Sequence, residues 1–277
     1  MDGVFELKIK NILNRARLLG ELPMKPLQDS VASQPLRNQI IPPNLYQTWE
    51  TNLFGKTHLL SMQYFRSLNP ELNFKLFNKD QRHSYMEEFW GQHPIYRVFK
   101  NAQFGPMKAD IFRYCILYER GGFYFDISKG CKVSLNSLCP MNIDGLISYE
   151  SHDCPILPDF PLTQTLLLHP DKFVLQWGMG FSKSHLILKK MIENICEYYP
   201  YFQGKIYESP KNAILRFTGP GMFSKSVREF FMEEKNIKIA QAGIDFNGQG
   251  IFALKGSEVR YLTSPSYALI NAAQIVT

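Results

Sequence analysis

The sequence predicts an α/β fold with a mainly parallel central sheet, and the order of its segments supports that class. From residue 39 onward, strand-like and helical stretches alternate in the order of βα units. The stretch MKADIFRYCILYERGGFYFDIS, residues 107–128, then joins a helical pattern through a Gly-Gly pair to a short aromatic strand. Because parallel strands end at one edge of their sheet, a ligand site is expected at that edge.

The apolar periodicity places the individual elements. Apolar runs and alternation predict strands within residues 39–49, 73–77, 123–128, 145–150 and 173–179. Apolar residues at helical spacing predict helices near residues 57–68, 79–90, 104–120, 185–198 and 222–233. Gly121 and Gly122 end the third of these helices in the manner of a C-cap. The glycine pair therefore lets the next strand return beside its helix with little steric bulk.

The composition is that of a globular chain. Its 277 residues, 45% of them hydrophobic, are enough for one large core. The sequence has no apolar run of 18 residues and no signal-like start, and its five cysteines form no CxxC pair, so we expect a cytoplasmic protein with reduced thiols. The net charge of +6 suits a phosphorylated substrate or an anionic surface. Without a Lys/Arg run, no nucleic-acid partner is expected.

The N-terminal part is predicted to be separate from the main domain. Residues 1–37 read as a helix and a Pro- and Ser-rich linker, and residues 38–277 as one domain. Residues 4–20 place apolar side chains at helical spacing, with Lys and Arg mostly on other faces. Such a helix makes a peripheral contact with the cytoplasmic face of a membrane, or it packs on its own domain.

Three polar residues of the quoted stretch are candidates for chemistry. Asp110 and Arg113 are three residues apart and share a helix face, and Asp126 follows the aromatic strand. A carboxylate at a strand end can ligate a divalent cation, an Asp can accept hydrogen bonds from sugar hydroxyls, and an Arg can stabilise a leaving diphosphate. The alternative is structural: a local ion pair between Asp110 and Arg113, with Asp126 capping a turn.

The motifs ADIFRY and LYERGGFYFD together resemble the signature of glycosyltransferase family 32, whose members carry the DXD sugar-binding region. The resemblance spans about residues 41–138, includes IPPNLYQTW, and extends more loosely through WGMGF and FTGPGMF. It implies a GT-A type, Rossmann-like fold over residues 38–277. It also implies a nucleotide-diphosphate sugar donor, such as a UDP- or GDP-sugar, and transfer with retention of anomeric configuration.

The resemblance assigns roles to particular residues. It implies that Trp49 stacks on the donor base, that Asp110 and Arg113 hold the sugar and diphosphate, and that Asp126 is the first DXD carboxylate. The further donor-binding residues that it implies are Gln47, Thr48, Gly121, Gly122 and Tyr124. Mn²⁺ or Mg²⁺ is the implied cofactor, with Asp126 and Ser128 at the two metal-binding positions.

The sequence departs from the family pattern at two places. Ser128 stands where the second DXD carboxylate is expected, so the metal keeps at most a neutral hydroxyl there. Many relatives place a His or an aromatic residue near the metal late in the chain, for which Asp245, Asn247 or Tyr267 are the substitutes here. Lys129, directly after the motif, either supplies part of the cation's charge or is simply solvated.

Other motifs carry weaker signals. Residues 177–181 (WGMGF) form either a flat wall of a binding site or core packing. Residues 218–221 (TGPG) either present backbone N–H groups to a diphosphate or are ordinary helix-entry residues. His83, His93 and His152 have no Ser or Cys partner at motif spacing, which gives a hydrolytic triad no support.

The resulting functional prediction is a glycosyltransferase that moves a sugar from a nucleotide-diphosphate sugar to a glycan or a lipid-linked acceptor. A non-catalytic, degenerate protein that binds sugar nucleotides or acts as a scaffold is the alternative, and Ser128 is the main argument for it. A glycoside hydrolase is a third possibility, but it needs two carboxylates at a fixed separation, which a sequence does not reveal.

Overall fold

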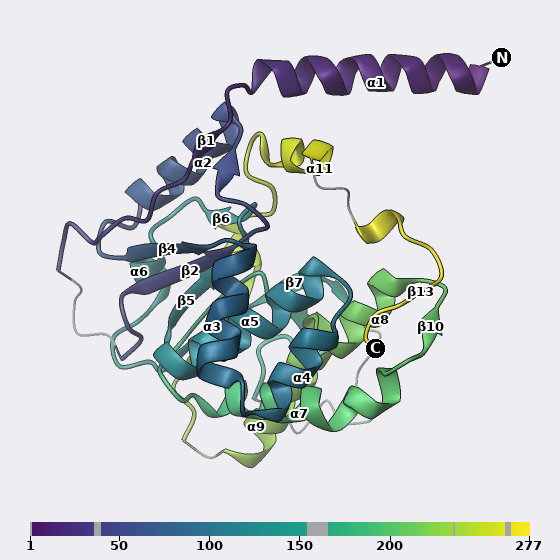
Figure 1. Cartoon of the computed structure of the whole chain (residues 1–277). Helices are drawn as coiled ribbons and strands as arrows, with labels where there is room; N and C mark the ends of the chain where they lie inside the picture. Colours follow the sequence, from purple (N-terminus) through teal and green to yellow (C-terminus); the bar gives the residue numbers. More distant parts are fainter. Residues whose placement is uncertain (1, 36–39, 154–165, 235, 264–266) are drawn as a thin grey trace.

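A computed structural model of the chain describes residues 2–35, 40–153, 166–234, 236–263 and 267–277 (Figure 1). Its helices are α1 (Asp2–Gly20), α2 (Lys56–Ser67), α3 (Lys79–Trp90), α4 (Pro94–Asn101), α5 (Gly105–Arg120), α6 (Leu135–Leu138), α7 (Leu186–Phe202), α8 (Pro210–Phe217), α9 (Pro220–Glu233), α10 (Asp245–Gly248) and α11 (Arg260–Thr263), with short 3₁₀ turns at Ser257–Val259 and Tyr267–Leu269. Its strands are β1 (Lys25–Pro26), β2 (Asn44–Thr48), β3 (Leu53–Phe54), β4 (Asn73–Phe77), β5 (Gly122–Phe125), β6 (Gly130–Cys131), β7 (Gly145–Asp153), β8 (Lys172–Val174), β9 (Gly178–Phe181), β10 (Ile206–Tyr207), β11 (Ile239–Ile244), β12 (Gly250–Ile251) and β13 (Ala273–Gln274).

The central sheet has seven strands in the order β11-β7-β9-β5-β2-β4, with β8 paired to β7. The pairs β11·β7, β2·β4 and β2·β5 are parallel, whereas β9 runs antiparallel to both β5 and β7. This topology confirms the predicted α/β fold with a mainly parallel sheet. The segment expected to be one strand at 173–179 is two, β8 and β9, because the chain leaves the sheet between Leu175 and Trp177.

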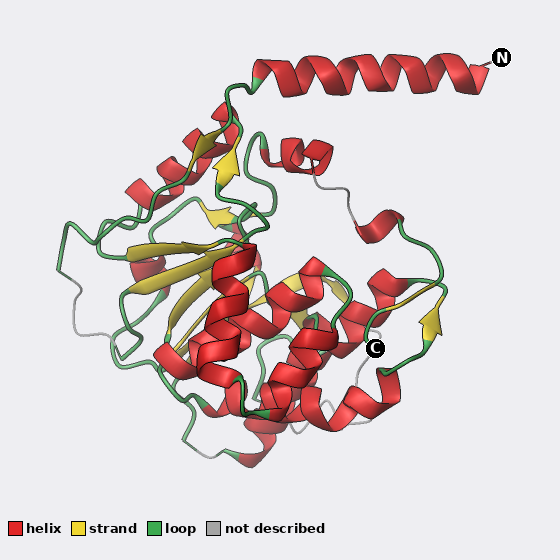
Figure 2. Ribbon diagram, viewed as in Figure 1, coloured by secondary structure: helices red, strands yellow, loops and turns green. Residues whose placement is uncertain are grey.

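The sheet separates two apolar layers, as alternation along its strands requires. On β5, Tyr124 packs into the layer formed by the helices α3, α4, α5, α7, α8 and α9, whereas Phe123 and Phe125 face the opposite layer with α2 and α6. Leu45 and Tyr46 of β2 divide between the layers in the same way. Figure 2 shows the strands in the middle of the body with helices over both faces.

The Gly-Gly pair acts as the sequence predicts. Gly121 is the C-cap of α5 with φ of 66°, and its N–H donates to the Leu117 carbonyl over 2.8 Å. At Gly122, φ is 110°, and a Cβ atom would lie 2.4 Å from the Asn44 carbonyl oxygen of β2. No other residue fits there without moving one of the two strands.

The distances of Arg113 and Asp126 from this turn determine where both residues lie relative to the sheet. Eight residues of α5 separate Arg113 from the turn, which is about 12 Å at the helical rise. Four residues of β5 carry the chain back to Asp126, which is about 13 Å at the strand rise. Arg113 and Asp126 therefore reach the same level, at the carboxyl edge of the sheet.

The N-terminal helix extends away from the body in Figure 1, and its described residues Leu13 and Leu19 are exposed. The segment after it does not hang free. Residues of β1 pair with β3, Leu27 is buried, and the Ser30 N–H donates to the Phe74 carbonyl of β4. The predicted boundary between residues 37 and 38 falls outside the described residues, so the division into domains stays a prediction.

Two further expectations concern membranes and thiols. Among the described helices, none combines the length and the apolar character that crossing a bilayer requires. The four cysteines of the described residues, Cys115, Cys131, Cys139 and Cys196, are free thiols, and Cys154 lies outside those residues.

Candidate active site

A cleft of about 500 Å³ opens at the carboxyl edge of the sheet. Its walls come from the end of β2, the first turns of α5, the turn after β5, and the C-terminal segment around α11. The lining residues that the sequence also singles out are Thr48, Trp49, Asp110, Arg113, Tyr124, Asp126, Ser128, Lys129 and Tyr267. The cleft therefore gathers most of the predicted site residues at the edge where the topology places a ligand.

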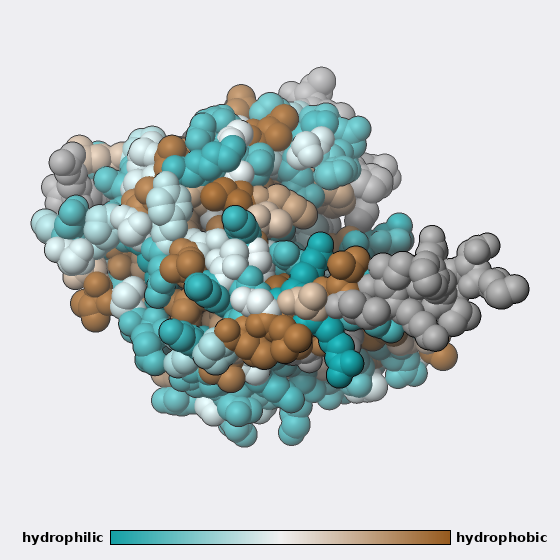
Figure 3. Space-filling view, turned by 90° about the horizontal axis from the view of Figure 1, so that it is seen from above, coloured by the Kyte–Doolittle hydropathy of each residue, from teal (hydrophilic) through white to brown (hydrophobic). Residues whose placement is uncertain are grey.

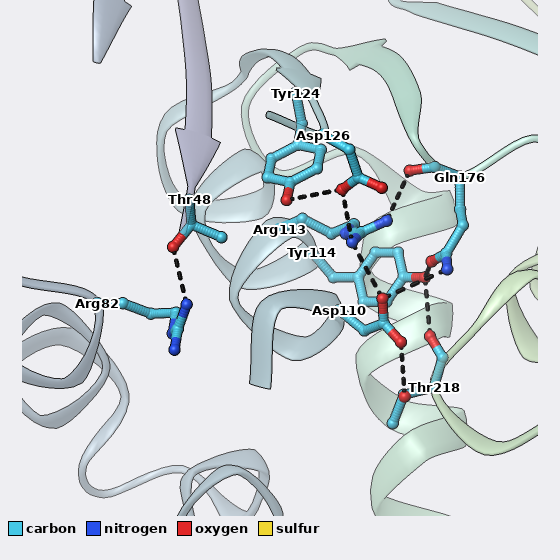
Figure 4. A network of polar contacts seen from close by, with 9 residues as sticks. All are labelled: Thr48, Arg82, Asp110, Arg113, Tyr114, Tyr124, Asp126, Gln176 and Thr218. Atoms are coloured by element: carbon cyan, nitrogen blue, oxygen red, sulfur yellow. Dashed lines mark hydrogen bonds and ion pairs between the residues drawn. The ribbon is translucent and has the colours of Figure 1, made fainter. Parts of the chain in front are cut away.

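Arg113 joins the two predicted carboxylates at the base of the cleft (Figure 4). Its Nη2 lies 3.1 Å from Asp110 Oδ1 on the same helix and 3.0 Å from Asp126 Oδ1 after β5. The Tyr124 hydroxyl donates to the same Asp126 oxygen over 3.1 Å, and the guanidinium lies over the Tyr124 ring. The ion pair expected from the three-residue spacing exists, and it continues to the strand end instead of remaining local.

Polar groups of Thr218, Gln176 and Tyr114 hold this cluster in place through hydrogen bonds. The Thr218 hydroxyl donates to Asp110 Oδ2 over 2.9 Å, and Gln176 Nε2 donates to Asp110 Oδ1 over 3.3 Å. Arg113 Nη1 donates to the Gln176 carbonyl, and the Tyr114 hydroxyl donates to Gln176 Oε1 and to the Thr218 carbonyl. These contacts hold the carboxylate of Asp110 and the guanidinium of Arg113 in one orientation (Figure 4).

Burial controls the charges of the cluster. Asp110 is 4% exposed, and burial raises the pKa of its carboxyl to about 7 against the opposing effect of Arg113. Burial also disfavours the charge of Arg113, yet Asp126 and its other partners outweigh that effect and raise the pKa of the guanidinium. Burial lowers the pKa of Lys129 to about 8, although Asp126 opposes the shift. The cleft thus holds a cation beside Asp126 and beside a buried carboxyl group, that of Asp110, whose pKa is raised.

The turn that carries Asp126 and Ser128 is anchored from both sides. The Asp126 N–H donates to the Trp177 carbonyl, and the Leu254 N–H donates to the Ser128 carbonyl over 2.7 Å. His58 Nε2 lies 3.0 Å from the Ile127 carbonyl, and burial lowers the pKa of this imidazole to about 4. The neutral ring therefore donates to that carbonyl, and the turn presents its side chains to the cleft from a fixed backbone.

An aromatic and cationic group forms the opposite wall. Trp49 follows β2, and its ring meets the Tyr261 ring edge to face at 6.5 Å. The guanidinium of Arg260 lies over the Trp49 ring at 5.3 Å and over the Tyr261 ring at 4.2 Å. Trp49 thus lines the cleft with the Arg260 guanidinium over its ring, and its role in base stacking stays a prediction.

Sequence reasoning missed a second ion pair in the cleft, between a buried arginine and a partly exposed glutamate. Arg82 of α3 is fully buried, and its guanidinium donates to the Thr48 hydroxyl over 3.0 Å and to Glu50 over 2.9 Å. One signal could have revealed it: Arg82 stands on the helix face of Tyr85 and Met86, where a lone cation among apolar residues needs a partner. Gln176 offered a similar signal, as an amide between the apolar residues Leu175 and Trp177.

Three predicted donor-binding residues do not line the cleft. Gln47 is buried within β2. Gly121 and Gly122 lie at the opposite, amino end of β5, against Pro42, Lys183 and Asn44. Their contacts form the turn that sets the register of α5 and β5, which is a structural reason for glycine at both positions.

The weaker candidates divide between core and site. Gly178 and Gly180 pack against the Phe125 and Phe123 rings, so residues 177–181 are core. Thr218 lies behind the cleft and binds Asp110 through its hydroxyl. Of the three late residues proposed to stand near a metal, Tyr267 lines the cleft, whereas Asp245 and Asn247 do not. His83, His93 and His152 also lie outside the lining.

The described residues do not form a metal site by themselves. No group of three or more His, Cys, Asp or Glu side chains among them is close enough to hold a metal ion. At the DXD positions, one oxygen of Asp126 already binds Arg113 and Tyr124, and Ser128 offers only a neutral oxygen. This donor set is too poor in anionic oxygen to hold Mn²⁺ or Mg²⁺ without ligands from another molecule.

Curated relatives match about two thirds of the chain. The initiation-specific α-1,6-mannosyltransferase of Candida albicans is 26% identical over 208 residues, which are 68% of this chain and 53% of that protein. The mannosyl phosphorylinositol ceramide synthase SUR1 of Saccharomyces cerevisiae is 27% identical over 214 residues, 74% of this chain and 53% of that protein. The matched part of each is thus about half of its length.

Among solved structures, the PaToxG glycosyltransferase superposes with a TM-score of 0.49 at 15% identity, covering 80% of this chain and 76% of that one. Residues 55–143 match the family model described as the glycosyltransferase sugar-binding region containing the DXD motif. Asp110, Arg113, Asp126 and Ser128 fall inside this range, and Trp49 precedes it. The match confirms the resemblance found in the sequence: residues 55–143 are similar to the sugar-binding region of the DXD glycosyltransferases.

Proposed function

We propose that this protein is a glycosyltransferase that moves a sugar from a UDP- or GDP-sugar to a glycan or a lipid-linked acceptor, with retention of anomeric configuration. Both relatives carry mannose in their names, so a mannosyl donor is the first to test. The name of the second relative also contains a ceramide lipid, which supports a lipid-linked acceptor as one arm of the proposal.

One observation supports the proposal more strongly than the others do. Arg113 bridges two carboxylates at the base of a cleft that also exposes Trp49, and the cluster lies inside the matched sugar-binding region. Each carboxylate oxygen has two lone pairs, so Asp110 and Asp126 keep acceptor capacity for sugar hydroxyls beyond their present contacts. A flat ring at one end and sugar-binding carboxylates at the other match the two ends of a nucleotide sugar.

The proposed reaction is a substitution at the anomeric carbon of the donor. The bond from that carbon to the diphosphate oxygen breaks, and the electron pair leaves with the diphosphate. The acceptor hydroxyl forms the new bond and gives its proton to the departing phosphate oxygen. The negative charge that develops on this leaving group has to be stabilised by groups already in place, which is the general means by which such sites accelerate transfer.

A non-catalytic sugar-nucleotide-binding protein is the second candidate, and Ser128 is the observation in its favour. The residue is buried in the anchored turn and cannot supply the second anionic ligand of a DXD site. Such a protein would bind nucleotide sugars in the same cleft and release no nucleotide from them.

The test is donor turnover. The protein is incubated with a panel of UDP- and GDP-sugars, mannosyl donors first, and the release of free nucleoside diphosphate is measured with and without candidate acceptors. We expect slow release without acceptor and faster release with the right one. Asp110→Asn should lower the rate by about a hundredfold, because the amide keeps the shape but loses the charge facing Arg113.

A matched variant separates the cleft from general effects of the substitution. Asp171→Asn changes the same chemical group on the surface, outside the cleft lining, and should turn over donor like the wild type. Binding of a nucleotide sugar without any release would support the non-catalytic candidate. Equal turnover by Asp110→Asn and the wild type would contradict the assignment of the site.

A further inference from the structure

Two arginines of the cleft, Arg113 and Arg82, are engaged by carboxylates already present. Nη2 of Arg113 faces both Asp110 and Asp126, and Arg82 is paired with Glu50. A diphosphate that approaches these two arginines therefore meets charges that carboxylates already balance. The missing carboxylate at Ser128 removes the usual means of adding positive charge, a cation held between two acidic residues.

Lys129 differs from these arginines in its partners. Its Nζ donates to the Phe252 carbonyl over 2.6 Å and lies over the Phe252 ring and 5.6 Å from the centre of the Trp177 ring. Within the described part of the chain, Nζ forms no ion pair with a carboxylate. Its contacts are neutral groups, which leaves a net positive charge on the wall of the cleft.

The backbone places this charge next to the DXD position. The Lys129 N–H donates to the Asp126 carbonyl over 2.8 Å, which closes the turn and brings both side chains to the same wall. The carbonyl of Phe252, directly after β12, holds Nζ, and β12 pairs with β6 immediately after the turn. The ammonium is therefore pre-positioned, so less side-chain freedom is lost when an anion binds.

We propose that Lys129 binds the diphosphate of the nucleotide donor and supplies there the positive charge that a metal held by a second carboxylate at position 128 would supply. This inference rests on the proposed function. It requires that nucleoside diphosphate binding survives without a divalent cation and depends on the ammonium of Lys129. A lysine that only tethers the segment around Phe252 would satisfy neither requirement.

The test measures binding of UDP and GDP, with UMP and GMP as monophosphate probes, in EDTA and in Mg²⁺. Wild type, Lys129→Arg, Lys129→Met and Lys132→Met are compared by calorimetry. Lys132 is a matched control, because its Nζ also donates to a backbone carbonyl of the same segment, that of Gly248, and it lies outside the cleft lining. Methionine keeps most of the apolar stem and removes the charge.

Wild type should bind one of the two diphosphates in EDTA. Lys129→Met should weaken that binding by about tenfold to a hundredfold, the range of a lost charge-assisted hydrogen bond, with a change of less than about threefold for the monophosphate. Lys129→Arg and Lys132→Met should stay within about threefold of wild type for both probes.

Two outcomes would overturn the inference and leave the proposed function standing. One is diphosphate binding by wild type only in Mg²⁺, with Lys129→Met unchanged. The other is an equal loss of monophosphate and diphosphate binding in Lys129→Met, which indicates a structural role. If wild type bound none of the four nucleotides in either buffer, the inference and the proposed function would fail together.

Discussion

At the scale of single residues, the stability of the site and its chemistry depend on the same buried charges. Asp110 and Arg113 are 4% and 3% exposed, so neither is solvated enough to be stable alone. Each is compensated by the other, and Thr218, Gln176 and Asp126 add further hydrogen bonds to the pair. The loss of one member of this cluster should therefore lower the free energy of unfolding more than the loss of one member of a surface ion pair would.

Arg113→Met should lower the free energy of unfolding by about 3 to 5 kcal/mol, because it leaves Asp110 buried without its counter-charge. Arg120→Met is the matched control on the same helix, where the arginine is paired with Glu119 at the partly exposed end of α5 and should cost about 1 kcal/mol or less. Urea unfolding monitored by circular dichroism measures both. Similar losses in the two variants would show that the buried cluster is not a stabilising unit.

At the scale of elements, the sequence predicted what depends on local pattern. The ranges 73–77 and 79–90 are β4 and α3 to the residue, because their apolar spacing and a capping box at Asn78 define the ends. The helix α4 and the strand β11 were missed, and residues 173–179 were expected to be one strand. The strand β11 depends on its pairing with β7, a partner distant in sequence that a local pattern does not encode. The helix α4 carried local signals, the cap residue His93 and Pro94 in its first turn, which were overlooked.

The candidate site shows the same limit. Asp110, Arg113 and Asp126 could be found because two share a helix face and the third follows a strand at the expected edge. Gln176 and Arg82 could not be assigned to the cluster, because they come from other elements and their contacts depend on packing. The glycine pair was recognised as the turn between helix and strand, but the donor-binding role that the resemblance implied for it fails, because the cleft lies at the other end of β5.

The turn between α5 and β5 requires a glycine at position 122, and this requirement can be tested. Gly122→Ala should destabilise the fold by more than about 3 kcal/mol, because the new methyl group would lie 2.4 Å from the Asn44 carbonyl oxygen in addition to the strain at φ of 110°. Gly204→Ala, at φ of 70° with no atom within 4 Å, carries only the backbone strain and should cost about 1 to 2 kcal/mol. Thermal unfolding of the two variants gives the comparison, and equal shifts would argue against the close approach of the strands.

The titration of His58, which binds the turn after β5, should make the free energy of unfolding depend on pH. The imidazole is neutral in the fold with a pKa of about 4, and the unfolded value is about 6.5, so its contribution to stability is complete above pH 6.5 and is lost as the pH falls toward 4. This contribution should fall by about 2 kcal/mol between pH 7.5 and pH 5.

His58→Gln keeps a donor for the Ile127 carbonyl and removes the titration. The loss of unfolding free energy between pH 7.5 and pH 5 should therefore be smaller in the variant than in wild type, by that amount. Urea unfolding at several pH values measures the slope, with His152→Gln at an exposed position as the control. Parallel profiles for wild type and His58→Gln would show that the buried ring does not titrate with folding.

At the scale of the whole molecule, the N-terminal helix is joined to the body at the start of α2. Glu21, directly after α1, accepts a hydrogen bond from the Thr57 N–H through its carboxylate and from the Lys56 N–H through its carbonyl, at the start of α2. The body thus holds the base of α1 while the helix extends outward (Figure 1). Seen from above, this side of the molecule is a mosaic of hydrophilic and hydrophobic residues without one continuous apolar patch (Figure 3).

We predict that α1 attaches the protein to anionic membranes. Among its described residues, Lys10, Arg15 and Arg17 are exposed, and so are Leu13 and Leu19. Cations near an anionic surface contribute about 1 kcal/mol each, and leucines inserted at the headgroup boundary add apolar burial. Leu13 and Leu19 are 58% and 68% exposed and belong to none of the apolar clusters of the described residues, so a second surface is free to take them.

Co-sedimentation with phosphatidylcholine vesicles, with and without phosphatidylserine, measures this attachment. Wild type should bind the anionic vesicles more tightly and lose that preference in high salt, because exposed charges are screened. Arg15→Gln combined with Arg17→Gln should weaken anionic binding by about tenfold or more, since two cations are lost. Lys205→Gln combined with Lys211→Gln removes the same charge from exposed positions near α8 and should bind like wild type. Equal losses in the two double variants would mean that net charge, and not α1, governs the contact, and no binding by wild type would leave α1 without a membrane role.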